Sequence, residues 1–420
     1  MIFENIEIID LSNDYKGIAF INNKKCFISN AIVGDIVNLE ITEEKSKYLV
    51  GKVLEYIKKS DFRNSEVKCK YFGKCGGCAL QYLKEEYYYK IKKQNLLNYI
   101  KNSGYSYDIN NLEIFKVGFG KRRRINLKYS NGIYGFFEKN SKNIIEFDNC
   151  LNIVVELNEA IKMFKDFKFK NLDSLDIFYT GIVVSINMIF SDEPEINDFK
   201  QLDVFKGKNC IISYTCTEKQ NYIPIIGTAE DIKLKLDNLQ IIVPQNCFLQ
   251  ATEESQDFMI NIIKKAIEEN SSKKSKIADL YCGIGTYSFP LAKNGCKIFS
   301  YEGDKNMINN IKKNIVANNI KNIFPYQKDL FNQPLSVREL NEFDIIIINP
   351  PRNGAENQCK NIVKSNVKKV VYISCSPQSL ARDLKLFKNN GFEIKKIVMV
   401  DQFYLSEHVE SIVILEKIVN

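Results

Sequence analysis

Cys375 offers the most reactive side chain of this sequence in a position where it could act. It follows the apolar run 370–374 and precedes Ser376 and Pro377. Serine is a favoured helix N-cap and proline fits the first helical position, so the thiol is expected directly before a helix. The partial positive charge of a helix N-terminus lowers the pKa of a thiol, which makes Cys375 a candidate nucleophile. The alternative is a structural thiol, the role expected of five other cysteines: Cys210, Cys216, Cys282, Cys296 and Cys359.

A carboxylate is the candidate base that would accompany this thiol. The chain contains a single histidine, His408, so every catalytic or metal-binding arrangement that needs several histidines or a Cys-His pair is disfavoured. Glu410 follows two residues later, just before the apolar run 412–415, which predicts a strand. We interpret Glu410 as a general base and His408 as a positioning or packing residue. A plain surface acid is the alternative for Glu410.

A glycine turn between an expected strand and an expected helix predicts a nucleotide-type cofactor site. Gly283 and Gly285 allow the backbone to approach a ligand closely, and Glu302 ends the next expected strand, where a carboxylate can accept ribose hydroxyl groups. A nicotinamide enzyme would look similar, but Ser288 occupies the place of the third glycine of the dinucleotide fingerprint. The turn therefore favours S-adenosylmethionine, which needs no pyrophosphate cradle.

A second turn, Asn349-Pro350-Pro351, follows the fourth expected strand of this region. The turn resembles the Asn-Pro-Pro turn of methyltransferases that act on exocyclic amines. In those enzymes the next residue is aromatic and stacks on the base. Arg352 stands there instead, which weakens that alternative. The pattern of RNA cytosine-5 methyltransferases has a cysteine at the place where this chain has Pro351. The lack of a cysteine there disfavours a cytosine substrate.

The elements that must position these residues alternate between helix and strand. From about residue 246 helical spacing of Phe258, Ile262 and Ala266 is followed by strand-like runs at 277–281, 297–301, 344–348 and 370–373. An uninterrupted apolar run such as 344–348 is typical of a strand covered on both faces. Residues 246–420 therefore predict a Rossmann-like α/β domain with a doubly wound parallel sheet.

The preceding residues predict two β-rich domains. Residues 1–59 contain about five short alternating strands with turns at Asn22-Asn23 and Gly34-Asp35, which suggests a small barrel of the oligonucleotide-binding type. Their pattern resembles the TRAM domain, a small RNA-binding barrel. Residues 60–245 begin with a cysteine-rich segment and an expected helix at 85–103, and continue with strands such as 124–129 and 177–189. We expect three domains: 1–59, 60–245 and 246–420.

The charge of the chain favours a polyanionic partner. Its formal net charge is +8, from 59 Lys and Arg against 51 Asp and Glu, which alone is also compatible with an ordinary solvated surface. The run Lys121 to Arg124, followed by Lys128, concentrates positive charge and predicts contact with nucleic acid. No stretch is apolar for long enough to span a bilayer, so we expect a cytoplasmic protein without membrane contact.

Cysteines near residue 70 form a candidate metal site. In a reducing cytosol, twelve cysteines indicate metal binding or catalysis rather than disulfides. Cys69, Cys75 and Cys78 lie within ten residues, Gly76 and Gly77 allow a tight turn, and Cys150 could supply a fourth thiolate. Four thiolates suit both zinc and an iron–sulfur cluster.

Together these segments resemble the RNA uracil-5-methyltransferase family. The motifs that carry the resemblance occur in the family's order and spacing: DLYCGIGTYSFPLA, INPPRNG, YISCSPQSLARDL and DQFYLSEHVES. The resemblance implies a class I methyltransferase domain with Cys375 as nucleophile and Glu410 as base. It also implies contacts with S-adenosylmethionine by Gln250, Tyr281, Gly283, Gly285, Glu302, Asp329 and Asn349, although many members carry Asp at the place of Asn349. The spacing of Cys69, Cys75, Cys78 and Cys150 resembles the family's [4Fe-4S] centre more than paired zinc knuckles.

The chemistry that this resemblance implies needs one thiolate and one carboxylate. C5 of uracil is a weak nucleophile until a thiolate adds to C6, and a base must then remove the C5 proton. We expect an RNA substrate, with ribosomal RNA favoured and transfer RNA as the alternative, and a monomeric enzyme. A non-catalytic RNA-binding protein is a further alternative, but it would not need both Cys375 and Glu410.

Overall fold

The computed structural model describes residues 1–139, 141–217, 219–268 and 275–418. These residues separate into two compact units. The first comprises residues 1–95 and the short segment 405–407, and the second comprises residues 96–404 and 408–420. The expected division at 59 and 245 remains a prediction. Among the described residues, no helix is both long enough and apolar enough to cross a membrane.

A six-stranded sheet forms the start of the first unit. Its order is β1-β5-β6-β4-β3-β2, so the expected count of five strands is one too few. Alternating side chains of these strands build an apolar core, in which a Cβ on Gly51 would lie only 3.1 Å from the sulfur of Cys26. The strands are β1 Ile2–Glu7, β2 Asp10–Leu11, β3 Gly17–Ile21, β4 Lys24–Ser29, β5 Ile36–Glu44 and β6 Tyr48–Lys58.

A buried ion pair joins this sheet to the segment that follows it. The guanidinium of Arg63 donates to both oxygens of Asp35, over 2.8 and 2.6 Å, and Asp35 is fully buried. Asp35 also accepts from the backbone amides of Ile32 and Ser60. Helix α1, Glu85–Asn102, follows the cysteine-rich segment close to the predicted range, and its apolar side chains Leu96 and Ile100 are buried.

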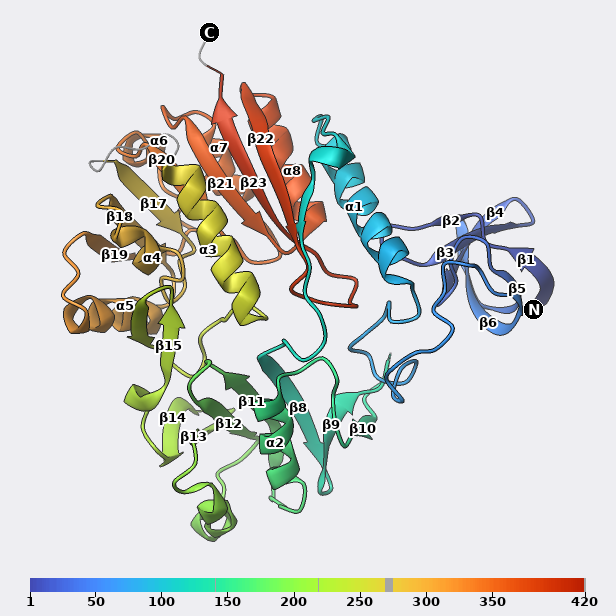
Figure 1. Cartoon of the computed structure of the whole chain (residues 1–420), viewed down its shortest axis with the longest axis horizontal. Coiled ribbons are helices and arrows are strands. Elements are labelled where there is room, and N and C mark those ends of the chain that lie inside the picture. Colours follow the sequence, from blue (N-terminus) through green and yellow to red (C-terminus); the bar gives the residue numbers. More distant parts are fainter. Residues whose placement is uncertain (140, 218, 269–274, 419–420) are drawn as a thin grey trace. The chain divides into compact units, whose positions relative to one another are not determined.

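A seven-stranded sheet lies at the start of the second unit (Figure 1). The prediction of a single strand over residues 177–189 is wrong. The segment belongs to a hairpin of two antiparallel strands, and the chain turns between them at residues 180–183, where Gly181 has a φ of +87°. Helix α2, Val155–Phe164, packs on β11 and β12. The strands, in the order β10-β9-β8-β11-β12-β13-β14 across the sheet, are β8 Arg124–Ser130, β9 Ile133–Phe137, β10 Ile144–Glu146, β11 Leu172–Tyr179, β12 Val184–Phe190, β13 Cys210–Cys216 and β14 Lys219–Ile226.

An eight-stranded sheet forms the rest of the second unit, in the order β19-β18-β17-β20-β21-β23-β22-β7. Strands β17 to β21 are parallel, as predicted, but β23 runs antiparallel to both β21 and β22, so the sheet is mixed rather than wholly parallel. The strands are β7 Glu113–Phe115, β17 Lys276–Leu280, β18 Lys297–Glu302, β19 Ile323–Gln327, β20 Ile345–Ile348, β21 Lys369–Ser374, β22 Phe392–Val400 and β23 Glu410–Lys417.

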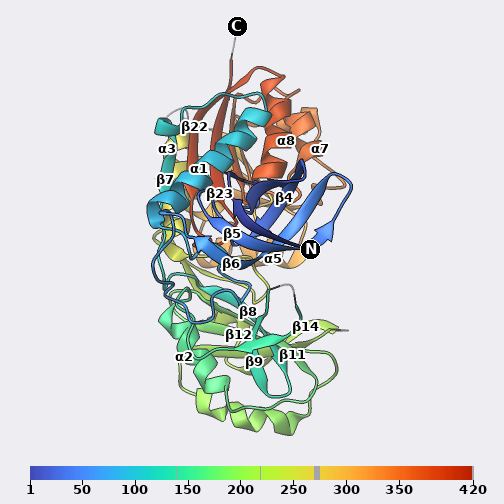
Figure 2. The same ribbon diagram turned by 90° about the vertical axis from the view of Figure 1, so that its right-hand side faces the viewer.

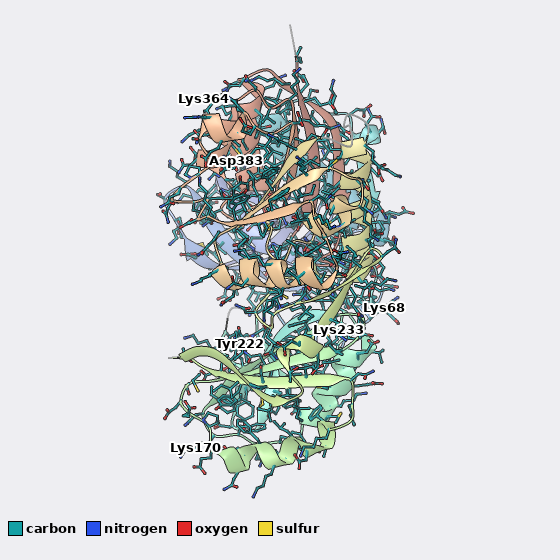
Figure 3. All side chains as sticks on the ribbon, turned by 90° about the vertical axis from the view of Figure 1, so that its left-hand side faces the viewer. Lys68, Lys170, Tyr222, Lys233, Lys364 and Asp383 are labelled. Atoms are coloured by element: carbon teal, nitrogen blue, oxygen red, sulfur yellow. The ribbon has the colours of Figure 1, made fainter. Side chains whose placement is uncertain are left out.

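Helices cover both faces of this sheet. Figure 2 views the sheet nearly edge-on, with α3 on one side and α7 and α8 on the other. Asp383 of α8, labelled in Figure 3, is fully buried and accepts from the hydroxyl of Tyr372 in β21 over 2.6 Å. The helices are α3 Glu253–Glu268, α4 Ser288–Ala292, α5 Lys305–Ala317, α6 Val337–Leu340, α7 Glu356–Ile362 and α8 Pro377–Lys388.

Short elements complete the described chain. A two-stranded hairpin of β15, Lys233–Leu236, and β16, Leu239–Ile242, precedes α3. The 3₁₀ helices are η1 Ile109–Asn111, η2 Ile196–Phe205 and η3 Ala229–Asp231.

Candidate active site

The residues singled out for chemistry gather at one edge of the eight-stranded sheet. Parallel strands end at the same edge, so Tyr281, Asn349 and Cys375, which follow β17, β20 and β21, lie together there. Because β23 is antiparallel, its first residue, Glu410, lies at that edge too. The ladder pairs Ser374 with Ser411, which places the thiol and the carboxylate at the ends of adjacent strands.

Cys375 lies where the sequence predicts, but its electrostatics differ from the expectation. Ser376 is the N-cap of α8 and accepts from the amide of Ser379 over 3.4 Å, with Pro377 in the first turn. Burial raises the pKa of the Cys375 thiol, and the nearby carboxylate of Glu410 raises it further. The expectation of a lowered pKa is therefore wrong, because burial and the neighbouring carboxylate outweigh the effects that lower it. Arg352 beside the thiol opposes them and lowers the pKa in part.

Glu410 is a buried carboxyl held by an amide. Its side chain is 3% exposed, and burial raises its pKa to about 8, although a hydrogen bond from Gln402 lowers it in part. The donor is Nε2 of Gln402, 2.8 Å from Oε2 of Glu410. A carboxyl with a pKa near the working pH can both take up and release a proton, which suits general base chemistry.

The glycine turn after β17 adopts backbone conformations that few other residues tolerate. Gly283 and Gly285 have φ values of +55° and +81°. A Cβ at Gly285 would lie 2.9 Å from the ring of Phe289, whereas a Cβ at Gly283 would meet nothing within 4 Å. Gly285 thus serves the packing of α4, and Gly283 leaves open space beside its backbone. An open approach to the backbone is what a cofactor at this turn requires.

Glu302 connects the turn to the next strand. Its Oε2 accepts from the amide of Gly283 over 3.0 Å, and its Oε1 accepts from the amides of Gly303 and Asp304 over 2.7 and 3.1 Å. A carboxylate has further lone pairs, so these bonds orient Glu302 without exhausting its acceptor capacity. The position at the end of β18 is compatible with the predicted contact to ribose hydroxyl groups.

Ser288, which replaces a third glycine, has a structural role. Its hydroxyl donates to Oδ2 of Asp279 over 2.6 Å and lies 2.7 Å from the hydroxyl of Ser300. All three side chains are fully buried, and burial raises the pKa of Asp279 to about 7. This contact fixes α4 against β17 and β18. The role of Asp279 is not readable from the local sequence, because it depends on Ser300 in another strand.

The other predicted cofactor residues surround the turn. Tyr281 has a φ of +60°, its ring centroid lies 5.4 Å from that of Phe331, and its buried hydroxyl has no hydrogen-bond partner among the described residues. Asp329 is exposed and holds its own turn by accepting from the amides of Phe331 and Asn332. The backbone amide of Asn349 donates to the carbonyl of Leu280 over 3.2 Å. An unpartnered buried hydroxyl next to open backbone fits a polar ligand such as the adenosine of S-adenosylmethionine.

Gln250 lies between the base and the cofactor turn. Its Oε1 accepts from Gln402 over 2.8 Å, and its Nε2 donates to the hydroxyl of Tyr287 over 3.2 Å. Sequence reasoning placed Gln250 at the cofactor but missed Gln402 and Tyr287. The motif that contains Gln402 was noticed, yet nothing in the local sequence shows that its side chain reaches residue 250.

The basic run 121–124 does not form one charged patch, which corrects the sequence-based interpretation. Arg123 is 2% exposed, donates to the carbonyl of Gln250 over 3.0 Å and to Oε1 of Gln256 over 2.7 Å. Arg124 is paired with Asp176 over 2.7 Å. Only Arg124 lies in β8, and the buried contacts of Arg123 together with the ion pair of Arg124 take both side chains out of a shared basic surface. Lys121 and Arg122 remain exposed.

In the described part of the chain, none of the four cysteines of the candidate metal site takes part in a disulfide bond. Cys69, Cys75 and Cys78 belong to the first unit, and Cys150 belongs to the second. Burial raises the pKa of Cys75, while the amide of Gly77 opposes this rise and the neighbouring Cys69 adds to it. Among the residues that the structure describes, no three His, Cys, Asp or Glu side chains converge as ligands of a metal ion.

Comparison with known proteins shows the class of fold first and a family resemblance second. The crystal structure of Pyrococcus abyssi tRNA (uracil-54, C5)-methyltransferase in complex with S-adenosyl-L-homocysteine matches 99% of this chain and 100% of its own, with a TM-score of 0.75 and 21% sequence identity. This likeness shows the fold, and with the glycine turn it defines the eight-stranded part as a class I methyltransferase domain. Residues 218–418 match the family model of tRNA (Uracil-5-)-methyltransferase, and residues 4–54 match that of the TRAM domain. In these segments the chain is similar to the RNA uracil-5-methyltransferase family, as its sequence motifs predict.

Curated relatives match the chain over nearly its whole length. The 23S rRNA (uracil(1939)-C(5))-methyltransferase RlmD of Francisella tularensis subsp. novicida (strain U112) is 28% identical, over 99% of this chain and 97% of its own. The protein of the same name from Aliivibrio fischeri (strain MJ11) is 26% identical, over 98% and 96%. An uncharacterized RNA methyltransferase of Agrobacterium fabrum (strain C58 / ATCC 33970) is 27% identical, over 99% of both chains.

Proposed function

We propose that this protein transfers a methyl group from S-adenosylmethionine to C5 of a uridine in RNA, with Cys375 as nucleophile and Glu410 as base. The observation that carries the proposal is the joint placement of these two side chains at the carboxyl edge of the parallel strands. They are close enough for the carboxylate to raise the pKa of the thiol. A thiol and a carboxyl beside a cofactor turn are the groups that this reaction needs.

The residues act on the pyrimidine in sequence. Cys375, assisted by the positive charge of Arg352, adds as thiolate to C6 of uracil, and the electron pair of the C5–C6 double bond moves into a C4–C5 enolate. When bound, S-adenosylmethionine supplies an electrophilic methyl group. Glu410 then takes the C5 proton. The electrons of that C–H bond restore the C5–C6 double bond as the bond from C6 to sulfur breaks.

We further propose that the cofactor lies along the glycine turn. Gly283 and Gly285 would allow its close approach, Glu302 would accept from the ribose, and Tyr281 and Asp329 would contact the adenine side. Gln250 and Asn349 would lie nearer the methyl group and the base. The buried, unpartnered hydroxyl of Tyr281 supports this assignment.

Ribosomal RNA is the substrate class that we propose, because the full-length relatives from Francisella and Aliivibrio are named for a 23S rRNA position. Such a substrate would place the protein in the cytoplasm. Transfer RNA is the alternative, since the structurally similar Pyrococcus protein is named for a tRNA position. Mapping 5-methyluridine in both RNA classes from a deletion strain distinguishes them. Loss of the modification from 23S rRNA alone supports the proposal, and loss from tRNA alone contradicts it.

We also propose three domains, 1–59, 60–245 and 246–420, and a [4Fe-4S] cluster held by Cys69, Cys75, Cys78 and Cys150. The support is chemical: four cysteine thiols outside any disulfide match the donor set of such a cluster, and the amide of Gly77 is directed at the sulfur of Cys75. Protein purified without oxygen should contain about four iron and four sulfide per chain, and Cys75→Ser should lower both. Stoichiometric zinc without iron contradicts the cluster.

Two substitutions test the catalytic assignment. Cys375→Ser keeps the volume of the side chain but replaces the nucleophile, so 5-methyluridine formation should fall by at least about a thousandfold and no covalent RNA adduct should form. Glu410→Gln should form the adduct and fail to resolve it, which a denaturing gel detects. Cys210→Ala, which removes a buried thiol at the start of β13, is the matched control and should retain activity. Full activity of Cys375→Ser contradicts the proposal.

A further inference from the structure

Gln402 occupies a buried position directly beside the proposed base. It lies in the segment between β22 and β23, is 1% exposed, and is held from the far side by the backbone amide of Ala251, which donates to its Oε1 over 2.9 Å. Its Nε2 lies 2.8 Å from Oε2 of Glu410 and 2.8 Å from Oε1 of Gln250. An amide nitrogen carries two hydrogens, so both are engaged.

The direction of every hydrogen bond in this group is fixed. The amide of Ala251 can only donate, so it must face the oxygen of Gln402, and the NH₂ group must then face Glu410 and Gln250. The oxygen of Gln250 is thereby turned toward Gln402, and its own NH₂ group toward the hydroxyl of Tyr287. Oε2 of Glu410 consequently faces a donor that cannot accept a proton.

We propose that Gln402 is a positioning residue, which reserves Oε1 of Glu410 as the oxygen that takes the C5 proton and links the base to Gln250. This inference rests on the proposed function. A proton on Oε2 would point at the NH₂ group of Gln402, where two donors would oppose each other. The proton from C5 therefore goes to Oε1, as the C5–C6 double bond re-forms and the bond between C6 and the sulfur of Cys375 breaks.

The same hydrogen bonds also tie the base to the segment that precedes α3. Gln402 contacts both the backbone amide of Ala251 and the side chain of Gln250, the residue proposed to lie near the methyl group. A displacement of residues 250–251 would therefore move the amide that orients Glu410. The geometry thus makes the base and the cofactor-side glutamine parts of one rigid group.

Gln402→Glu separates this role from a purely structural one. The variant keeps an oxygen for the amide of Ala251 and nearly the same volume, but it replaces the donor facing Glu410 by a second carboxyl oxygen. A structural role alone predicts nearly normal turnover. The positioning role predicts a kcat lower by about tenfold to a hundredfold, the effect of losing a hydrogen bond to a charged group. The KM for RNA should fall together with kcat while kcat/KM stays near the wild-type value, because only a step after addition and methyl transfer is slowed.

The pH profile and the covalent adduct provide readouts that misfolding would not mimic. The groups that face Glu410 are Gln402, Cys375 and Tyr287, with Arg352 beside the thiol. The limb of kcat that reports the base should move to higher pH in Gln402→Glu, because a donor is lost and a second carboxyl competes for the proton. Uridine RNA should accumulate as a covalent adduct in the variant but not in the wild type.

RNA with 5-fluorouridine at the target serves as the control substrate, because it offers no C5 proton to remove. Wild type and Gln402→Glu should form its adduct at equal rates, which shows that addition and methyl transfer are intact. If Gln402→Glu does not fold, Gln402→Met removes the donor without adding a charge and should give the same slow step. Wild-type kcat and pH profile in the folded variant would overturn the role of Gln402. Absence of uridine methylation by the wild type would instead overturn the proposed function.

Discussion

At the scale of single residues, the thiol and the carboxyl share a site that disfavours their charged forms. Burial raises the pKa of both Cys375 and Glu410, and the negative form of either would oppose ionisation of the other. Arg352 is the group that favours the thiolate. Near neutral pH the buried pair is thus mainly protonated, which avoids placing two negative charges side by side. The ionised form of Glu410 becomes accessible as pH rises toward 8.

The raised pKa of Glu410 predicts a trade-off between activity and stability. Its pKa is about 8 in the folded protein against a usual value of 4.5. Below pH 4.5 both folded and unfolded chains hold the proton, so the group costs nothing. Between the two values only the folded chain holds it, and stability falls as pH rises until it levels off above about 8.

Glu410→Gln removes this titration and should therefore stabilise the protein increasingly across that range. At pH 7 the free energy of unfolding should rise by roughly 3 kcal/mol, while near pH 4 the two proteins should be alike. Urea denaturation at several pH values measures this, with Glu159→Gln on the exposed face of α2 as control. An equal effect of Glu410→Gln at pH 4 and pH 7 would contradict the assignment of a raised pKa.

At the scale of elements, Arg123 and Arg124, next to and at the first position of β8, hold the segment that carries Gln250. Arg123 donates to the carbonyl of Gln250, and its backbone amide donates to the carbonyl of Ala251 over 2.9 Å. Arg124 donates to the carbonyl of Cys247. The buried guanidinium of Arg123 has its pKa lowered by burial to about 10, and it remains charged at neutral pH. The two arginines at the start of β8 thereby fix the segment between β16 and α3.

Arg123→Met should consequently affect folding and cofactor binding rather than RNA binding alone. Loss of the buried hydrogen bonds leaves the carbonyl of Gln250 and the side chain of Gln256 without their donor, which costs about 2–3 kcal/mol of stability. The Kd for S-adenosylmethionine should rise by about tenfold as Gln250 loses its support. Denaturation and calorimetric titration measure the two effects. Arg122→Met, at an exposed neighbour, should leave both unchanged, and an equal loss of stability there would contradict the distinction.

At the scale of the whole molecule, charge concerns the interaction with RNA more than the fold. The net charge of +8 is spread over a chain whose basic run is partly buried, so the RNA contacts must come from residues distributed over several elements. Contacts to phosphates release counterions, and their strength therefore falls steeply with salt. Binding of S-adenosylmethionine involves no row of phosphates, so its affinity should depend much less on salt.

The KM for RNA should therefore rise by roughly tenfold or more between about 50 and 200 mM salt. The affinity for S-adenosylmethionine should change little over the same range and serves as the internal control. Steady-state kinetics with a ribosomal RNA fragment measures the first quantity, and equilibrium titration measures the second. A salt-independent KM for RNA would mean that phosphate contacts contribute little.

The sequence by itself determined the features that depend on neighbouring residues. The N-cap at Ser376, the glycine turn at 283–285 and helix α1 all follow from local preferences, and the structure has them where they were predicted. The resemblance to the family also follows from short motifs in a fixed order. Such patterns are readable because backbone conformation and capping depend on a few adjacent side chains.

Only the tertiary structure decided which distant groups meet. Arg123 is buried, and β23 is antiparallel, so Glu410 lies at the same sheet edge as Cys375. Gln402 contacts Gln250 although the two residues are 152 positions apart in the chain. The tertiary structure also reversed the expected direction of the thiol pKa. Burial and hydrogen bonding between remote segments set these properties, because the free energy of a charge depends on everything packed around it and not on its neighbours in sequence.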